Sequence, residues 1–295
     1  MSWRTLVVTG RAKLDYQLGY MVIRKDTEQQ IFLDDVNVLI LESTAISLTT
    51  YLLKELVNKK VKVVFCDDFH NPAAELAPFY NNKMSSANIE LQIGWKEDIK
   101  KKVWAEIIKQ KIINQAFVLA KNELVEKSKL LLEYVKEVQL GDSTNREGHA
   151  AKVYMNALFG NSFSRGQDNE INSALNYGYT ILLSAFNREI VASGYLTQLG
   201  IAHHNTYNYF NLSSDFMEPV RPLIDLFVKD SDFKEFGTEQ KHLTVDILNR
   251  GVRVRNEKQY LSNAIAIYVK SIINVLNSDK VEDIKFINIM EGEQL

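Results

Sequence analysis

The chain of 295 residues is poor in cysteine and proline, and it has no long uninterrupted hydrophobic run. Its single cysteine, Cys66, excludes an internal disulfide, and its place at the end of the apolar run 61–65 indicates a small buried side chain. No apolar stretch reaches the roughly 18–20 residues of a membrane-crossing helix, so no membrane contact is expected. Residues 1–4 show no basic stretch leading into an apolar segment, and we therefore expect a cytoplasmic protein.

The formal net charge is only −2, from 35 basic and 37 acidic residues. A protein covered with nucleic acid over its whole surface carries a basic excess, so any DNA contact here depends on local basic patches. One lysine-rich stretch can be either a solvated helix face or a track for DNA. Its lysines are Lys96, Lys100, Lys101, Lys102, Lys109 and Lys111. The stretch from Asp279 onward is acidic and is not expected to bind DNA.

The first 80 residues carry short β-branched and aromatic runs between charged or glycine-bearing turns, which is typical of a sheet. Strands are expected at 5–8, 20–23, 30–33, 36–40 and 61–65, and one helix at 47–58. This part contains no glycine-rich phosphate loop and no paired cysteines. We therefore expect it to serve as a scaffold or dimer interface rather than to carry chemistry.

After residue 80 the hydrophobic period changes to that of helices. Six residues share one helix face, and the aliphatic ones among them are expected to face a core. They are Trp104, Ile107, Ile108, Lys111, Ile112 and Gln115. We predict an α+β protein with a small N-terminal β-sheet domain (1–80), a linker (81–95) and a larger all-α helical-bundle domain that ends in an acidic tail (96–295).

Glu147 is the first candidate for chemistry. It follows 143–145, a Ser-Thr-Asn segment suited to cap a helix that is expected to continue to about Leu158. In the first turn its carboxylate can complement the helix dipole or close a capping box. It can also face a ligand, because Ala150 and Ala151 share its helix face and allow close approach.

Further candidate donors come later in the chain. His203 and His204 are adjacent, and with no cysteine or further histidine nearby a tetrahedral structural zinc site is not expected. Asp215 and Glu218 lie three residues apart, which places both carboxylates on one side of a helical turn. Carboxylates with one imidazole form a donor set that suits Mg²⁺ or Mn²⁺. The same residues can instead be ordinary structural side chains.

Four segments together resemble the CRISPR-associated adaptation integrase family, which inserts new spacers into a CRISPR array. They are STNREGHAAK at 143–152, NSFSR at 161–165, NSALNYGY at 172–179 and NLSSDFMEPVRP at 211–222. The resemblance extends over nearly the whole chain and looks strongest to the type II-A branch. It implies an N-terminal β domain followed by a helical domain. One departure is Val220, where an aromatic residue is common in the family.

The resemblance implies three residues that are both catalytic and ligands of a divalent metal, Mg²⁺ or Mn²⁺. They are Glu147, His203 and Glu218. His203 is chosen over His204 because 199–203, Leu-Gly-Ile-Ala-His, matches the family's leucine-glycine-x-x-histidine register. The doubled histidine keeps His204 open as an alternative. Asp215 corresponds to a supporting carboxylate or alternative ligand.

The reaction implied is a metal-assisted transesterification, in which a 3′-hydroxyl of incoming DNA attacks a phosphodiester at the edge of a CRISPR repeat. The absence of a P-loop and of a serine or tyrosine nucleophile motif fits this chemistry. Four basic residues beside the ligand segments are candidate contacts to DNA phosphates or ordinary surface ion pairs. They are Arg146, Lys152, Arg165 and Arg221.

The resemblance also implies partners. These are double-stranded DNA as spacer fragment and CRISPR repeat, a second copy of the chain in a homodimer, and a small ferredoxin-like subunit that completes a heterohexamer. Other type II-A adaptation proteins and the effector nuclease are further candidates. Two alternative functions stay open. One is a metal-dependent nuclease or junction-resolving enzyme that uses water as nucleophile, and the other is a non-catalytic architectural DNA-binding subunit with degenerate carboxylates.

Overall fold

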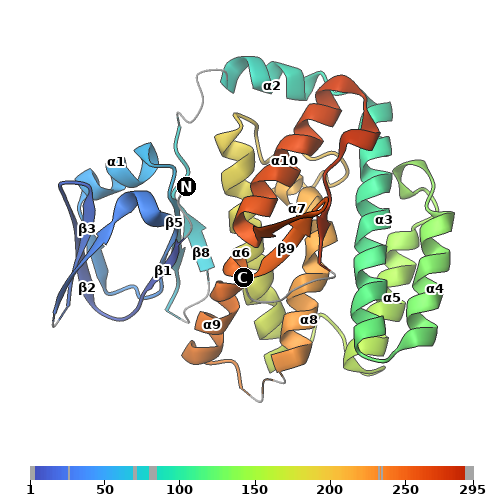
Figure 1. Cartoon of the computed structure of the whole chain (residues 1–295), viewed down its shortest axis with the longest axis horizontal. Coiled ribbons are helices and arrows are strands. Elements are labelled where there is room, and N and C mark those ends of the chain that lie inside the picture. The colour runs from blue at the N-terminus through green and yellow to red at the C-terminus, as the bar shows by residue number, and fades with distance from the viewer. Residues whose placement is uncertain are drawn as a thin grey trace.

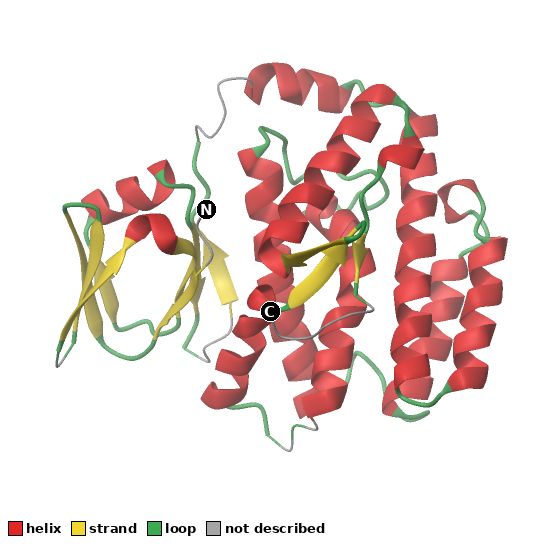
Figure 2. Ribbon diagram, in the orientation of Figure 1, coloured by secondary structure: helices red, strands yellow, loops and turns green. Residues whose placement is uncertain are grey.

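The computed structural model describes residues 4–25, 27–68, 72–79, 85–231, 233 and 235–289. A strand-rich N-terminal part lies beside a larger, predominantly helical part (Figures 1 and 2), and the α+β fold class is confirmed. None of the described helices is both long and apolar enough to cross a membrane. The end of the predicted acidic tail, 290–295, lies outside the described residues.

Two four-stranded sheets form the N-terminal part. In the first, β1 (Arg4–Val8), β5 (Val36–Leu41) and β7 (Lys62–Cys66) run parallel, and β8 (Pro72–Glu75) pairs antiparallel with β7. The predicted strands 5–8, 36–40 and 61–65 fall in this sheet. The strand β8 was not expected from the sequence, since its four residues carry no hydrophobic alternation.

The second sheet has the order β4-β3-β2-β6. Its members are β2 (Ala12–Gln17), β3 (Tyr20–Arg24), β4 (Glu28–Phe32) and β6 (Ile46–Leu48). The helix expected at 47–58 begins only at Thr50 as α1 (Thr50–Asn58), because Ile46–Leu48 pairs with β2 and the Thr49 side chain caps the helix by accepting the N–H of Leu52.

The central strand β5 joins the two hydrophobic cores of the molecule. All six of its residues are buried. Leu39 and Leu41 face a core between the N-terminal sheets and α1, whereas Val38 and Ile40 belong to the large core of the helical part. Alternate side chains of a strand point to opposite faces, so a nearly continuous hydrophobic run, interrupted here by Asn37, predicts burial on both sides.

Nine helices make up the described helical part. They are α2 (Ser85–Ile93), α3 (Glu97–Lys121), α4 (Val125–Glu137), α5 (Arg146–Phe159), α6 (Glu170–Ala192), α7 (Asn211–Met217), α8 (Arg221–Ser231), α9 (Thr238–Val245) and α10 (Leu261–Ser278). The helix α2 lies within 81–95, the range assigned to a linker. A three-stranded antiparallel sheet, not expected from the sequence, packs against α10. It consists of β9 (Gly251–Val254), β10 (Glu257–Tyr260) and β11 (Ile287–Asn288).

The long helix α3 is the centre of the helical part and contacts α4, α5, α8 and α10. Its predicted core face is buried, with Ile107, Ile108 and Ile112 fully inaccessible. Lys111 on the same face is only 8% exposed. The interpretation of Lys111 as part of a solvated face or DNA track is therefore wrong. A buried ammonium needs a charged partner, and the partners of Lys111 define the site described below.

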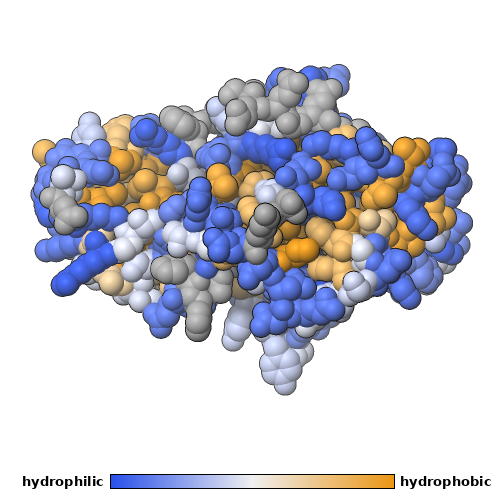
Figure 3. All heavy atoms as spheres, turned by 90° about the horizontal axis from the view of Figure 1, so that it is seen from below, coloured by the Kyte–Doolittle hydropathy of each residue, from blue (hydrophilic) through white to orange (hydrophobic). Residues whose placement is uncertain are grey.

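The surface carries hydrophobic areas on both parts of the molecule, set among hydrophilic residues (Figure 3). On the N-terminal part, exposed hydrophobic side chains include Leu18, Tyr20 and Phe32. The rings of Tyr20 and Phe32, from paired strands, lie 5.3 Å apart between centroids. This cross-strand aromatic pair leaves apolar surface at the edge of the second sheet.

Candidate functional site

Two glutamates from different elements meet at one buried lysine. Glu147 lies in the first turn of α5, and Glu218 begins a short 3₁₀ helix, Glu218–Val220, between α7 and α8. The Lys111 Nζ atom of α3 is 2.6 Å from Oε1 of Glu147 and 2.5 Å from Oε2 of Glu218. Glu218 is 4% exposed, so most of this ion triad lies inside the protein.

The start of α5 is capped without help from the Glu147 carboxylate. The buried Asp142 carboxylate accepts the backbone N–H groups of Arg146, at 2.8 Å, and Glu147, at 3.0 Å. The Asn145 side chain accepts the N–H of Gly148, as expected for an N-cap residue. The first-turn amides therefore have other acceptors, and the Glu147 side chain points to Lys111 instead of closing a capping box.

The turn that carries Glu218 is fixed from two sides. Asn114, fully buried one helical turn after Lys111, donates its side-chain amide to the carbonyl oxygen of Pro219 over 2.6 Å. The Arg221 Nε atom lies 2.8 Å from Oε1 of Glu218. The two oxygens of this carboxylate thus face different cations, Arg221 on one side and Lys111 on the other. This arrangement holds Glu218 in one orientation.

Asp215 organises the loop that carries His203. Its fully buried carboxylate accepts the backbone N–H groups of Ile201, Ala202 and His203 at 2.7, 3.0 and 3.1 Å. It also lies 2.5 Å from Nδ1 of the His203 ring. An ionised carboxylate can only accept, so in the neutral imidazole Nδ1 carries the proton and Nε2 keeps its lone pair. Such a carboxylate–imidazole pair orients metal-ligating histidines in many proteins.

The spacing of glycine and histidine in 199–203 has a steric cause. A Cβ atom on Gly200 would lie 2.8 Å from Oδ2 of Asp215 and would clash with the backbone of His203. Only glycine lets the chain fold this closely around the carboxylate. The neighbouring His204 makes no comparable contact with Asp215, although both histidines are exposed to solvent. The two adjacent histidines therefore have different environments.

The electrostatics of the site favour its charged forms. Burial disfavours the Glu218 carboxylate, but the charges of Lys111 and Arg221 outweigh it and lower the pKa of Glu218. Burial likewise disfavours the Lys111 ammonium, yet Glu218 and Glu147 raise the pKa of Lys111 above its usual value. The hydrogen bond to Asp215 raises the pKa of His203. The ring of Trp104 from α3 packs edge-on against this imidazole, 5.8 Å between centroids.

The donors suit a hard divalent cation in kind, although they do not form a ready-made cage. Within the described ranges, no three His, Cys, Asp or Glu side chains lie together as a metal site. Oε2 of Glu218 is buried and accepts no hydrogen bond from the described residues, so the Lys111 ammonium contacts it only as an ion pair. The two carboxylates supply the oxygen ligands that Mg²⁺ and Mn²⁺ prefer, and the imidazole nitrogen shifts the preference toward Mn²⁺.

The four basic candidates differ in their surroundings. The guanidinium groups of Arg165 and Arg221 both lie over the Tyr179 ring, 5.3 and 4.8 Å from its centroid. Arg146 pairs with Glu137 of α4 at 3.0 Å. Lys152 is exposed on α5. Arg221 is thus tied to the site itself, Arg165 lies close to it across one tyrosine, and Arg146 is engaged with α4.

Sequence reasoning missed three residues that build this site: Lys111, Asn114 and Asp142. The sequence places Lys111 on the apolar face of α3 and also within a lysine-rich stretch, 96–111. The signal that could have found it is a lysine in register with isoleucines, since a charged group on a core face needs buried partners. Asn114 and Asp142 leave weaker signals, because a lone amide or carboxylate occurs in many contexts.

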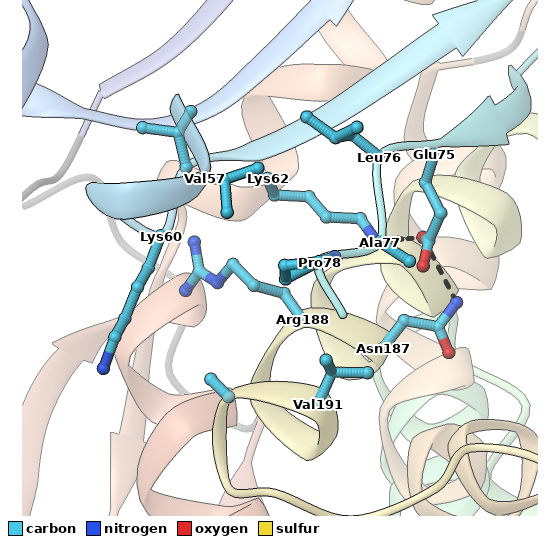
Figure 4. Close-up of a pocket in the computed structure, with 12 residues that line it drawn as sticks. Val57, Lys60, Lys62, Glu75, Leu76, Ala77, Pro78, Asn187, Arg188 and Val191 are labelled. Atoms are coloured by element: carbon cyan, nitrogen blue, oxygen red, sulfur yellow. Dashed lines mark hydrogen bonds and ion pairs between the residues drawn. The ribbon is translucent and has the colours of Figure 1, made fainter. Parts of the chain in front are cut away.

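Two open clefts flank the loop of His203 and His204, with volumes of about 530 and 420 Å³. His204 lines both, and Trp104 lines the smaller one. A third cavity lies at the junction of β7, β8 and α6 (Figure 4), where Lys62 and Glu75 point toward each other and Asn187 contacts Glu75. At about 30 Å³ it has room for a water molecule or two, not for a nucleotide.

The chain is similar in sequence to known proteins. Residues 6–231 match the family model of the CRISPR associated protein Cas1. The CRISPR-associated endonuclease Cas1 of Neisseria meningitidis is 34% identical over 273 residues, which cover 90% of this chain and 89% of that protein.

Solved structures share the fold at lower identity. A casposase bound to integration product superposes with a TM-score of 0.75 at 18% identity, covering 95% of this chain and 92% of that one. A Cas6-RT-Cas1–Cas2 complex gives a TM-score of 0.73 at 18% identity, covering 98% of this chain and 36% of that one. These matches extend over both the N-terminal sheets and the helices.

Proposed function

Since the chain belongs to the CRISPR associated protein Cas1 family, we propose that it is a metal-dependent integrase of CRISPR adaptation that joins new spacer DNA to a CRISPR array. The observation that carries this proposal is the convergence of Glu147 and Glu218, 71 residues apart in sequence, on one buried cation. Purely structural helix-terminal glutamates need no shared partner. Carboxylates that meet around a positive charge form the kind of site that divalent-metal chemistry uses.

We assign Glu147, Glu218 and His203 as the ligands of Mg²⁺ or Mn²⁺. When bound, the ion would lower the pKa of an attacking hydroxyl and neutralise charge that develops on the phosphoryl oxygens. The chain's own contribution is orientation. Asp215 holds the His203 ring so that its Nε2 lone pair is available, and this contact favours His203 over His204 as ligand. Asp215 itself is fully engaged with the loop and serves as a supporting residue.

The proposed reaction exchanges one phosphodiester for another. The 3′-oxygen of the incoming strand forms a new bond to phosphorus at the repeat edge, and the existing bond from that phosphorus to the 3′-oxygen of the attacked strand breaks. The attacking hydroxyl loses a proton and the leaving oxygen gains one. The number of phosphodiester bonds is unchanged, so no nucleotide hydrolysis is required. Arg165, Arg221, Lys152 and Arg146 are proposed contacts to phosphates around this centre.

The similar structures support a shared assembly. One of them is a casposase bound to an integration product, and another is a Cas6-RT-Cas1–Cas2 complex. We therefore propose double-stranded DNA as the substrate, a homodimer with apolar N-terminal surface at its interface, and a small ferredoxin-like subunit as partner. Membership of the type II-A branch and a cytoplasmic location stay predictions of the sequence.

The alternative with specific support is a nuclease, because the Neisseria meningitidis relative is named an endonuclease. Water and a 3′-hydroxyl can use the same metal and ligands, since both attack phosphorus through an oxygen. The two activities differ only in the nucleophile that reaches the site.

A joining assay separates these functions. The protein and its partner subunit are incubated with Mn²⁺ or Mg²⁺, a supercoiled plasmid that bears a CRISPR repeat, and a labelled short duplex. We expect label joined covalently to plasmid when the duplex ends in 3′-hydroxyls, and none when it ends in 3′-dideoxynucleotides. Plasmid cleavage that is equal with both duplexes and gives no joined label would favour the nuclease. No reaction under any condition, with folded protein, would favour the architectural alternative.

A further inference from the structure

Lys111 holds a position that the proposed metal chemistry does not explain. Its ammonium lies within 2.6 Å of one carboxylate oxygen from each proposed glutamate ligand. The helix that carries it also contacts the 3₁₀ turn of Glu218 through Asn114. Lys111 is therefore built into the same site as the ligands rather than lying beside it.

Without Lys111, the two carboxylates would differ in the cationic partners that remain to them. Glu218 keeps Arg221 at its other oxygen, 2.8 Å away. Glu147 has Lys111 as its ion-pair partner in the described part of the chain. Removing the ammonium would leave two negative side chains facing each other in a largely buried space, which repels them and disfavours folding. Lys111 thus keeps the carboxylates together in the absence of a metal.

A bound divalent cation and this ammonium compete for the same carboxylate oxygens, because two positive charges at that distance repel each other. Mg²⁺ binds carboxylate oxygen at about 2.0–2.1 Å and demands a defined geometry, and a lysine ammonium at hydrogen-bond distance from the same oxygens would repel it. A lysine has a flexible four-carbon stem, so its ammonium can move aside while the helix stays in place. Arg221 would continue to orient Glu218 during that exchange.

We propose that Lys111 is a positioning residue that stands in for the metal: it holds Glu147 and Glu218 together in the metal-free protein and is displaced from them when a divalent cation binds. This inference rests on the proposed metal-dependent function. It makes Lys111 a competitor that weakens metal binding and a support that stabilises the empty site. The two roles have opposite signs, and a purely structural lysine would have only the second.

The test compares the full-length protein with Lys111→Met and with Lys109→Met as matched control. Lys109 lies on the same helix, half-exposed and paired with Glu106 at 2.7 Å, so its loss removes the same charge outside the site. Mn²⁺ binding is measured by the loss of the free-ion electron paramagnetic resonance signal, and melting temperature is measured with and without Mn²⁺.

We expect Lys111→Met to bind Mn²⁺ about tenfold or more tightly than the wild type, because a unit positive charge at the site has been removed. Without metal it should melt roughly 5–10 °C lower, and Mn²⁺ should raise its melting temperature more than that of the wild type. Lys109→Met should match the wild type in both measurements. If Lys111→Met does not fold, Lys111→Gln, which keeps an amide donor but no charge, should show the same gain in affinity.

The outcomes separate this inference from the proposed function. Mn²⁺ binding by the wild type with equal or weaker binding by the Lys111 variants overturns the stand-in role and leaves the metal site intact. Binding by neither protein overturns the proposed metal dependence and the inference with it. Binding only after Lys111 is replaced supports the inference, since the lysine then blocks the site. An equal gain in Lys109→Met would also overturn it, because the effect would then be one of net charge.

Discussion

Two buried lysines in this molecule differ in their carboxylate partners and in the direction in which their pKa is shifted. Lys62 of β7, 4% exposed, pairs with one carboxylate, Glu75, at the junction between the N-terminal sheet and α6. Burial lowers the pKa of Lys62, Glu75 opposes this effect, and the positive charge of Arg188 adds to it. Lys111, 8% exposed, is shared by Glu147 and Glu218, and their combined charge overcomes burial and raises its pKa.

The difference indicates what each cluster is for. At the junction a single carboxylate faces a lysine with an arginine close by, which is an arrangement that fixes one element against another. At the helical site two carboxylates from distant segments share one cation, so negative charge is concentrated at a point. Two carboxylates that share one ammonium keep a net negative charge, which attracts a divalent cation. An ordinary ion pair is already neutral and does not. The comparison therefore predicts different consequences for the same substitution in the two places.

The largest expected effect is loss of joining when a shared carboxylate is neutralised. Glu147→Gln or Glu218→Gln should lower the initial rate of duplex–plasmid joining by about a thousandfold or more, because metal-ion charge stabilisation contributes several kcal/mol. Glu75→Gln makes the same change at the junction and should leave the rate within a few-fold of the wild type.

Folding has to be checked in each of these variants. A carboxylate in a helix's first turn contributes only about 0.3–1 kcal/mol through the dipole. Glu218 is buried between Lys111 and Arg221, so its removal costs more, about 3–5 kcal/mol when one partner of a buried ion pair is lost. Glutamine keeps the shape and one acceptor. A Glu218→Gln protein that unfolds at assay temperature would make Glu218 a structural residue, and a folded, fully active one would contradict the assigned site.

A second, smaller effect is expected at Asp215. Asp215→Asn preserves shape but replaces one acceptor oxygen with a donor, so it cannot bind Nδ1 of His203 and three backbone amides as the carboxylate does. Loss of such a supporting carboxylate typically costs about 10–100-fold in metal affinity or activity. Joining rate and Mn²⁺ affinity should fall together in this range.

The pH dependence of stability gives an independent measurement on the same variant. Asp215 raises the pKa of His203, so the folded state of the metal-free wild type holds the imidazole proton more tightly than the unfolded state. That stabilisation is fully present below the unfolded pKa of about 6.5 and is lost as pH rises through the folded pKa. The wild type's advantage over Asp215→Asn should shrink as pH rises above about 6.5. A constant difference would show that Asp215 supports only the backbone.

Local patterns in the sequence predicted much of the fold. The strands at 5–8, 20–23 and 36–40 could be found because their β-branched runs coincide with buried or partly buried positions. The start of α5 could be found because Asn145 does cap it. The strand β11 could not, since its two residues pair with β9 across 33 or more residues and carry no pattern until the chain is folded.

The candidate site likewise has a part that the sequence predicts, the chemical types of its residues, and a part that it does not, their geometry. Glu147, His203, Asp215 and Glu218 stand in short motifs, so their chemical types can be read from the sequence together with the family resemblance. Their geometry depends on α3, a helix that contributes no recognised motif. The position of the Lys111 ammonium between two carboxylates results from tertiary packing, and a sequence read alone gives only a lysine on an apolar face.

The smallest effect is expected when the junction pair is replaced as a unit. Lys62→Met combined with Glu75→Gln removes both charges, and glutamine can still accept from the Asn187 amide, now 3.4 Å from Oε2 of Glu75. Replacing a whole buried ion pair by residues of similar volume is often neutral, so the free energy of unfolding should change by no more than about 1 kcal/mol. Joining and Mn²⁺ affinity should equal those of the wild type.

Lys62→Met alone should be less stable than the double variant, since it leaves Glu75 buried without its cation. If the double variant instead lost Mn²⁺ binding while remaining folded, charge at the junction would influence the helical site, and the two lysines could no longer be treated as members of independent clusters.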